Sequence, residues 1–455
     1  MIPASFWHGL TRHPNIAQIL TDPAECWVYG TDNSKQQAAP EAVFFPTQAD
    51  AVQAIVRQCA THQIPLTVRG RGTGTVGGAV PSLGGVVLCF ERMDKIQALN
   101  AADRFLITEP GVLNTAAQQA AREKGFFWAP DPSSQDYCTV GGNLAHNAAG
   151  PRAIKYGTCR ENTLGLVAVD GLGNLFHTGV HTTKGVVGYD LTRLLIGSEG
   201  TLGIIVEATL KLLPLPEGIA TLQAFYSTVD EAAQAVMTIM QSPLTPCTLE
   251  MLDGAALALI RQAHPELSIP EQAQAMLLIE VDGAKKALPD SLQSLIQLAQ
   301  NTGLIQAYPA RTEVERKSVW AARKALSPAL RTIAPGKLNE DVVVPISQLT
   351  NFIHFTHTLS QQHQLPIVNF GHAGNGNLHV NILFSEEQRD TAFQCLARVF
   401  EKVLELGGTL SGEHGIGLQK KAFIADEIDL TAFQHMQALK RVFDPQGILN
   451  PGKWI

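Results

Sequence analysis

Cysteine is scarce in this chain of 455 residues, and the seven cysteines follow no pattern. An odd number of scattered thiols fits a reducing compartment better than a disulfide framework. No two of them form a C-x-x-C pair, so the sequence argues against an iron–sulfur cluster or a zinc site held by cysteines. The cysteines are Cys26, Cys59, Cys89, Cys138, Cys159, Cys247 and Cys395.

An excess of positive charge and long apolar runs are also missing. The formal net charge is −7 at pH 7, which leaves no basic surface for nucleic acid, although a small anionic substrate needs only a local basic pocket. No apolar run approaches the roughly 20 residues of a membrane-spanning helix, and the start "MIPASFWHGLTRHPN" does not resemble a signal peptide. We expect a cytoplasmic protein, with peripheral contact to the inner face of the membrane left open.

Apolar runs that alternate with helical patterns indicate an α+β fold. Apolar residues recur at helical spacing from Ala51 to Cys59, and Thr47 is the expected capping residue of that helix. The stretch "LPLPEG" (213–218) ends the first group of strands, and the helices beyond it could cover one face of a second sheet. The expected strands are 42–46, 64–68, 85–90, 105–111, 162–170, 174–179, 202–214, 220–228, 246–252 and 275–283. The expected division is 1–40, 41–214, 215–410 and 411–455.

A glycine-rich loop follows the strand-like run at 64–68. Gly72, Gly74 and Gly77 fit the dinucleotide pattern G-x-G-x-x-G. A Rossmann unit needs a helix after these glycines, but the next strand-like run begins eight residues after Gly77 and Pro81 lies between them. The sequence therefore excludes a Rossmann site, while the exposed backbone N–H groups of such a loop can still bind an anion.

Two further stretches of small residues, 130–157 and 197–214, accompany this loop. With the later motifs "GHAGNGNLH", "GGTLSGEHGIG" and "FDPQGILNPGK" they resemble the FAD-linked dehydrogenases of the vanillyl-alcohol-oxidase superfamily. The resemblance is to the branch of D-lactate dehydrogenase, the glycolate oxidase flavin subunit and D-2-hydroxyglutarate dehydrogenase. It implies a two-part FAD-binding domain of the PCMH type, an α+β substrate (cap) domain, and a C-terminal segment that returns to the flavin.

The same resemblance assigns residues to the cofactor. Thr73 stands where relatives with covalent flavin often carry histidine, which implies non-covalent FAD. Cys138 lies near the position of a flavin-linking cysteine in some distant relatives, but a buried free thiol is the expected role here. The implied FAD-binding residues are Arg69, Gly70, Arg71, Gly72, Thr73, Gly74, Gly77, Gly78, Pro130, Asp131, Pro132, Thr139, Gly141, Gly142, Asn143, Asn147, Glu199, Gly200, Ile205, Asn450 and Lys453.

Two histidines and a glutamate form a candidate metal site. If the runs around "GHAGNGNLHVN" pair as a hairpin, the turn brings His372 and His379 together, and Asn381 shares a strand face with His379. Glu413 follows on a glycine-flanked loop, and this ligand set suits a divalent cation with open positions, zinc or manganese. Asn375 stands where relatives usually have aspartate, which removes a carboxylate that could support the ligands.

Such a site suits the oxidation of a 2-hydroxy acid, with His414 as general base and hydride transfer to FAD, and the resemblance implies the D configuration. The cations offered for the substrate carboxylate are Arg323, Lys324, Arg331 and Lys337; the resemblance favours Arg323 and Lys337, and Asn381 is a further substrate-binding candidate. An oxygen-using oxidase and a flavin-binding subunit of a larger complex are the alternatives. The electron acceptor is left open among a quinone, a cytochrome and an electron-transfer flavoprotein, and the oligomeric state is left open with a homodimer as one candidate.

Overall fold

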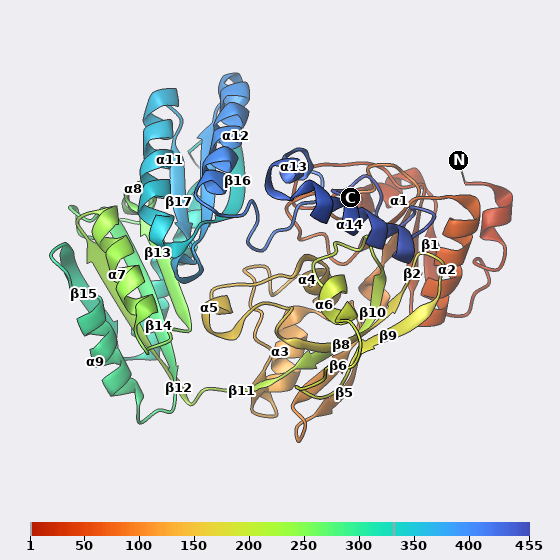
Figure 1. The fold of residues 1–455 in the computed structure, drawn as a ribbon, viewed down its shortest axis with the longest axis horizontal. Coiled ribbons are helices and arrows are strands. Elements are labelled where there is room, and N and C mark those ends of the chain that lie inside the picture. Colours follow the sequence, from red (N-terminus) through yellow and green to blue (C-terminus); the bar gives the residue numbers. More distant parts are fainter. Residues whose placement is uncertain (1, 331–332) are drawn as a thin grey trace. The chain divides into compact units, whose positions relative to one another are not determined.

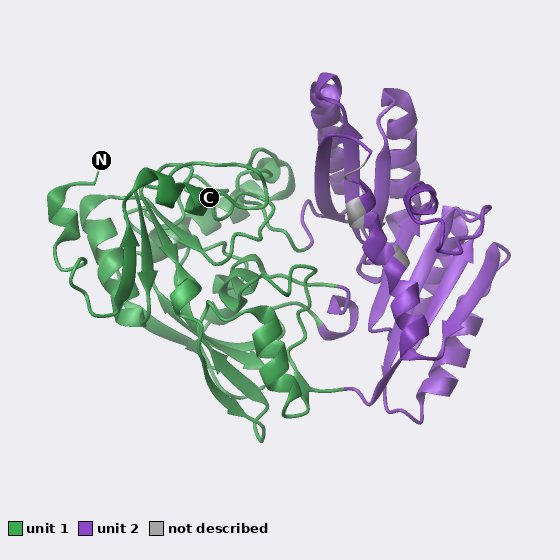
Figure 2. Ribbon diagram, turned by 180° about the vertical axis from the view of Figure 1, so that it is seen from behind, with its two compact units in different colours: residues 1–150, 157–215, 413–455 green, residues 151–156, 216–412 purple. Residues whose placement is uncertain are grey.

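The computed structural model describes residues 2–330 and 333–455, except for a few side chains within the last helix before this gap. The chain forms two compact units (Figure 2). Unit 1 comprises Met1–Gly150, Gly157–Leu215 and Glu413–Ile455, and unit 2 comprises Pro151–Tyr156 and Pro216–Gly412. The finer division into four stretches stays a prediction.

The N-terminal part of unit 1 is a four-stranded sheet in the order β1 (Ile16–Leu20), β2 (Ala42–Pro46), β4 (Val86–Cys89), β3 (Leu66–Arg69). Both β2 and β3 run parallel to β4, and helix α2 (Ala49–His62) connects β2 to β3. No helix lies between β3 and β4 among the residues that the structure describes there. The predicted absence of a Rossmann helix is therefore confirmed.

Helix α2 buries its predicted apolar positions, from Ala51 to Cys59. The prediction of Thr47 as its capping residue was wrong, because the N-cap position is Gln48. Thr47 is instead fixed at the end of β2, where its backbone N–H and its hydroxyl both donate to the carbonyl of Asn15.

The second sheet of unit 1 is antiparallel and has five strands. Its order is β5 (Ile96–Asn100), β6 (Phe105–Thr108), β10 (Ile204–Lys211), β8 (Thr163–Val169), β9 (Leu175–Gly179), and β7 (Phe126–Phe127) pairs separately with β11 (Leu213–Pro214). Its buried side chains, such as Leu166 and Ala208, pack with Trp128 and Leu144 in one apolar cluster. The helices of unit 1 besides α2 are α1 (Pro23–Trp27), α3 (Asn114–Arg122), α4 (Val140–His146), α6 (Leu191–Leu195), α13 (Ile424–Glu427) and α14 (Leu430–Phe443).

The C-terminal segment completes unit 1. Leu449 forms a parallel bridge with Leu66 of β3, and the Lys440 ammonium donates to Asp444 and to the carbonyls of Thr201 and Leu449. The last residues of the chain are thereby tied to the edge of the first sheet.

Unit 2 is built on a seven-stranded antiparallel sheet (Figure 1). Its order is β15 (Leu304–Ala310), β12 (Gly218–Tyr226), β14 (Ala275–Gly283), β13 (Thr248–Asp253), β17 (Ile367–Gly371), β18 (Asn377–Phe384), β16 (Gly336–Val343). The predicted hairpin around residues 371–384 is confirmed, because β17 and β18 are antiparallel neighbours.

Helices cover both faces of this sheet, whereas the sequence analysis had indicated helices for one face. Helices α8 (Gly254–Ala263) and α10 (Glu313–Leu330) pack on the face that carries Leu252, Leu278 and Phe370. The alternate positions on β13 are buried as well. A second layer consists of helices that contact one another: α7 (Val229–Gln241), α9 (Leu288–Leu298), α11 (Leu349–His363) and α12 (Arg389–Glu405). The short helix α5 (Ala153–Tyr156) lies beside the sheet, next to β13.

Among the described residues, no helix combines the length and the apolar character that crossing a bilayer requires.

Candidate functional site

Unit 1 contains a cavity of about 230 Å³ where its glycine-rich segments meet. The loop after β3, the segment leading into α4 and the turn before β10 all contribute to its wall. The predicted cofactor residues that line it are Gly70, Arg71, Gly72, Thr73, Gly74, Gly78, Pro132, Thr139, Gly141, Gly142, Asn143, Glu199, Gly200 and Ile205.

The other predicted cofactor residues do not belong to the lining, but two of them, Asn450 and Lys453, support its wall. Asn450 donates its amide hydrogens to the carbonyls of Gly78 (3.1 Å) and Glu199 (2.6 Å), and the buried Lys453 ammonium donates to the carbonyl of Val80. Burial lowers the pKa of Lys453 to about 8. The predicted residues outside the lining are Arg69, Gly77, Pro130, Asp131, Asn147, Asn450 and Lys453.

The glycines of the cavity wall serve two different purposes. At Gly70 an added Cβ would lie 2.4 Å from Thr139 Oγ1, so the protein itself needs glycine there. At Gly74 the nearest protein atom would be 3.9 Å away, so the space beside this glycine is left for a ligand. The buried Asn143, which lines the cavity, has no partner for Nδ2 among the described residues. Backbone without side chains and a vacant donor suit a pyrophosphate.

One loop of unit 1 carries Glu413 and His414 into this cavity. The Glu199 carboxylate accepts the N–H groups of Ile416 (2.7 Å) and Gly417 (2.8 Å), and His146 Nδ1 donates to the carbonyl of His414 (3.0 Å). The position of His414 is therefore fixed by two residues that also line the cavity. His146 was not predicted from the sequence, where it reads as one polar residue in a run of small ones.

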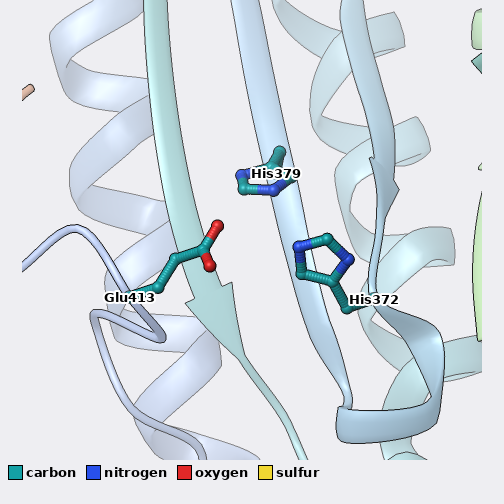
Figure 3. Close-up of side chains that lie close together, drawn as sticks. All are labelled: His372, His379 and Glu413. Atoms are coloured by element: carbon teal, nitrogen blue, oxygen red, sulfur yellow. The ribbon is translucent and has the colours of Figure 1, made fainter. Parts of the chain in front are cut away.

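His372, His379 and Glu413 lie together, as Figure 3 shows, with the two imidazoles and the carboxylate turned toward one another. Each of them offers one ligand atom, and these atoms all lie within 4.8 Å of one another. The two rings are nearly perpendicular, with centroids 5.5 Å apart. Two nitrogens and a carboxylate oxygen in this arrangement fit a divalent cation.

The hairpin explains the convergence of the histidines. His372 follows β17 directly, and His379 on β18 is opposite Phe370. Gly371 has φ of 157°, and a Cβ there would lie 2.5 Å from the carbonyl of Asn377. Only glycine lets the chain turn so closely at this point.

Glu413 is carried to the histidines by a segment that is fixed on β16. The N–H of Gly412 donates both to the carbonyl and to the carboxylate of Asp341, each at 2.9 Å. Asp341 is the residue of β16 opposite His379. Because Glu413 is the next residue after Gly412, these bonds fix where its backbone begins.

Glu250, which the sequence analysis did not select, contacts the first histidine. This fully buried carboxylate on β13 accepts the Nδ1–H of His372 and, at 2.8 Å, the Nε–H of Arg323. Burial raises the pKa of Glu250, but its electrostatic interactions and hydrogen bonds with His372 and Arg323 outweigh this effect and hold the pKa well below its ordinary value. One signal could have revealed it: a single charge within the apolar strand "TLEML".

The predicted substrate-binding residues lie on the same part of unit 2. The Arg323 guanidinium lies over the ring of Phe370, 4.5 Å from its centroid. Asn381 is buried, donates to the carbonyl of His379 at 3.2 Å, and leaves Oδ1 without a partner among the described residues. Lys337 is half-buried on β16, opposite Leu383. Lys324 is exposed, and Arg331 falls outside the described residues.

The structure also describes two further positions that the sequence analysis discussed, Cys138 and Asn375. Cys138 is a buried free thiol, as expected, and burial raises its pKa. Asn375 lies in the short turn (Ala373–Asn375) between the two histidines.

Family models match both parts of the chain. A model of the C-terminal domain of FAD linked oxidases matches residues 215–454, and a model of an FAD binding domain matches residues 40–179. The chain therefore belongs to the FAD-linked oxidases and is an FAD-dependent oxidoreductase, as the resemblance predicted.

Individual proteins of similar sequence or structure support this family assignment. The chain is 38% identical over 430 residues to the glycolate oxidase subunit GlcD of Bacillus subtilis, covering 94% of this chain and 91% of that protein. It is 34% identical over 427 residues to D-lactate dehydrogenase of Anaerostipes hadrus, covering 92% and 90%. A solved structure of p-cresol methylhydroxylase with substrate bound has a TM-score of 0.78 at 15% identity, covering 100% of this chain and 97% of the other. The predicted PCMH-type fold is confirmed.

Proposed function

We propose that this protein oxidises a D-2-hydroxy acid, of the lactate, glycolate or 2-hydroxyglutarate type, to the 2-oxo acid. The reaction removes a hydride from C2 and a proton from the C2 hydroxyl. The observation that carries the proposal is the convergence of His372, His379 and Glu413, because Glu413 also lines the cavity that fits FAD. The names of the glycolate oxidase subunit and D-lactate dehydrogenase relatives support the substrate class.

The cofactors are held by the residues described above. The glycine-rich cavity holds FAD non-covalently, since Thr73 offers no imidazole for a flavin bond, and His372, His379 and Glu413 hold zinc or manganese. When bound, FAD would supply the hydride acceptor, and the cation held by these ligands would lower the pKa of the substrate hydroxyl and orient it.

The protein's own groups bind the acid and accept its proton. Arg323 and Lys337 attract the substrate carboxylates, and Asn381 offers its vacant oxygen to a hydroxyl or ammonium donor. His414 accepts the hydroxyl proton, since it lines the cavity and its backbone carbonyl is fixed by His146.

Anaerobic bleaching of the flavin tests the proposal. A panel of D- and L-2-hydroxy acids is mixed with the purified protein before chelation, after chelation and after return of Zn²⁺ or Mn²⁺. We expect a D-2-hydroxy acid to bleach the flavin, chelation to abolish the bleaching without releasing FAD, and the cation to restore it. Bleaching at the full rate in metal-free protein, verified by elemental analysis, would contradict the metal role.

A role as one subunit of a larger complex is the second candidate, because a relative is named a glycolate oxidase subunit. Turnover of the isolated chain with a dye acceptor measures whether it needs a partner. Oxygen consumption without dye distinguishes an oxidase from a dehydrogenase that reduces a quinone, a cytochrome or an electron-transfer flavoprotein. Size-exclusion chromatography with light scattering tests the proposed homodimer.

A further inference from the structure

Glu250 connects the metal-ligand candidates to the substrate-binding candidates. One of its carboxylate oxygens, Oε1, accepts from His372, and the other, Oε2, accepts from Arg323. Both contacts lie within unit 2, on the sheet face beneath helix α10. A turn of this one carboxylate would therefore move both partners.

Phe370 closes the set of contacts from the other side. Its ring lies beneath the Arg323 guanidinium, 4.5 Å from centroid to Cζ, and 5.5 Å from the ring of His379. The imidazoles of His379 and His372 are in turn neighbours. Glu250, His372, His379, Phe370 and Arg323 thus form a closed ring in which each side chain contacts the next.

The hydrogen bond to Glu250 determines which nitrogen of His372 carries the proton. A neutral imidazole carries its proton on one nitrogen only, and the hydrogen bond to a carboxylate places it on Nδ1. Nε2 then keeps its lone pair for a cation, and the ring orientation is fixed at the same time.

We propose that Glu250 is a positioning residue that sets, at once, the metal-facing orientation of His372 and the location of the Arg323 guanidinium. This inference rests on the proposed function. A fully buried carboxylate is unfavourable unless its charge is compensated, and here both compensating groups belong to the candidate site. Glu250 itself does not contact the substrate or the cation.

Glu280 provides a matched control. It is a buried glutamate on the neighbouring strand β14 of the same sheet face and also contacts α10, through Trp320 (2.9 Å) and Arg316 (3.7 Å). Thr221 donates to it as well. Among the described residues, none of the partners of Glu280 is a candidate metal ligand or substrate-binding residue, so Glu280→Gln reports the cost of disturbing the contacts with α10.

The experiment compares Glu250→Gln and Glu280→Gln in the full-length, FAD-loaded protein. Glutamine offers one acceptor oxygen where Glu250 serves two donors, so at least one bond is lost. We expect the Kd of Glu250→Gln for Zn²⁺ and Mn²⁺, measured by chelator competition without substrate, to rise roughly 10–100-fold. Its KM for the best hydroxy acid should rise as well. Glu280→Gln should change the melting temperature but leave both constants within about twofold.

The outcomes separate this inference from the proposed function. Parent protein that binds no cation and reduces no flavin would overturn both. Parent protein that does both, with Glu250→Gln indistinguishable from Glu280→Gln, would overturn only the role of Glu250.

A second variant, Glu250→Asp, covers the case in which Glu250→Gln does not fold. Glu250→Asp keeps the charge but withdraws it by one methylene, so the positioning role predicts weaker cation binding here too. If neither variant yields a folded flavoprotein while Glu280→Gln does, Glu250 serves the stability of the sheet and the positioning role is rejected.

Discussion

The two candidate sites of this protein use the polypeptide in different ways. The cavity of unit 1 is formed largely by backbone, because glycines such as Gly70 and Gly74 leave room in its wall. The two histidines of the candidate metal site belong to unit 2: His372 directly follows β17, His379 lies on β18, and Glu250 of β13 supports His372. The first site depends on missing side chains, and the second on specific ones.

This difference decides what a substitution does. An added carbon in the cavity obstructs a ligand or a neighbouring side chain, whereas a truncated side chain at the candidate metal site removes a donor or an acceptor. We therefore expect the two kinds of change to separate cofactor binding from chemistry, and the following variants test that separation.

The largest effect is expected for His414→Ala. The substitution removes the proposed base but keeps the backbone carbonyl that His146 contacts, so FAD should stay bound and the loop should keep its position. The rate of flavin reduction should fall roughly 10²–10⁴-fold, and its pH profile should lose one ionisation. Anaerobic single-turnover measurements test this, and reduction at the parent rate would end the assignment of His414 as base.

A smaller effect is expected for Gly74→Ala. Its Cβ meets only His146, at 3.9 Å, so the apoprotein should melt at the parent temperature while the Kd for FAD rises roughly 10–100-fold, as crowding of about 1–3 kcal/mol implies. Gly70→Ala is the contrasting variant, because its Cβ would lie 2.4 Å from Thr139 Oγ1 and should lower the melting temperature itself. Cation affinity should be unchanged in both. A normal Kd for FAD in Gly74→Ala would show that the cofactor does not pass this glycine.

The smallest effect concerns a histidine of unit 2 outside both sites. His357 contacts the buried Asp253 at 3.3 Å, and this hydrogen bond raises the pKa of His357, against the opposing effect of burial. A raised pKa in the folded protein stabilises it below the unfolded pKa of about 6.5, and this stability is lost as the pH rises through the folded pKa.

The measurement is the thermal melt of His357→Gln against the parent at about pH 5.5 and about pH 8.5. The variant should be the less stable at the lower pH, by less than about 1 kcal/mol because the side chain is partly exposed, and nearly equal at the higher pH. An equal difference at both values would mean that the charge of His357 does not contribute.

Most of the strands could be predicted because they are short apolar runs bounded by glycine and proline, such as 42–46 and 275–283. Two details could not. The predicted N-cap of α2 was wrong by one residue, because the Thr47 hydroxyl donates a hydrogen bond to the carbonyl of Asn15, a partner 32 residues away. The second helical layer on the sheet of unit 2 was missed, because an apolar strand reads the same whether one or both faces are covered.

The two candidate sites also differ in how much of each could be predicted from the sequence. Many residues that line the cavity are neighbours in sequence within a few motifs, so reading the motifs selected about half of the lining. Glu250 lies 122 residues before His372, and Arg323 lies 73 residues after Glu250. No spacing rule connects such positions, and only the order of strands β13, β17 and β18 in the sheet brings them together.

The three-part composition of unit 1 has a consequence for biosynthesis. Asn450 and Leu449 complete the wall around Gly78 and Glu199 and the edge of β3, yet they are translated after the whole of unit 2. At about 5–20 residues per second, the ribosome needs on the order of ten seconds or more to make the roughly 200 residues between the second and third parts of unit 1. Unit 2 can fold during that interval, whereas the wall of the cavity is completed only when the last residues emerge.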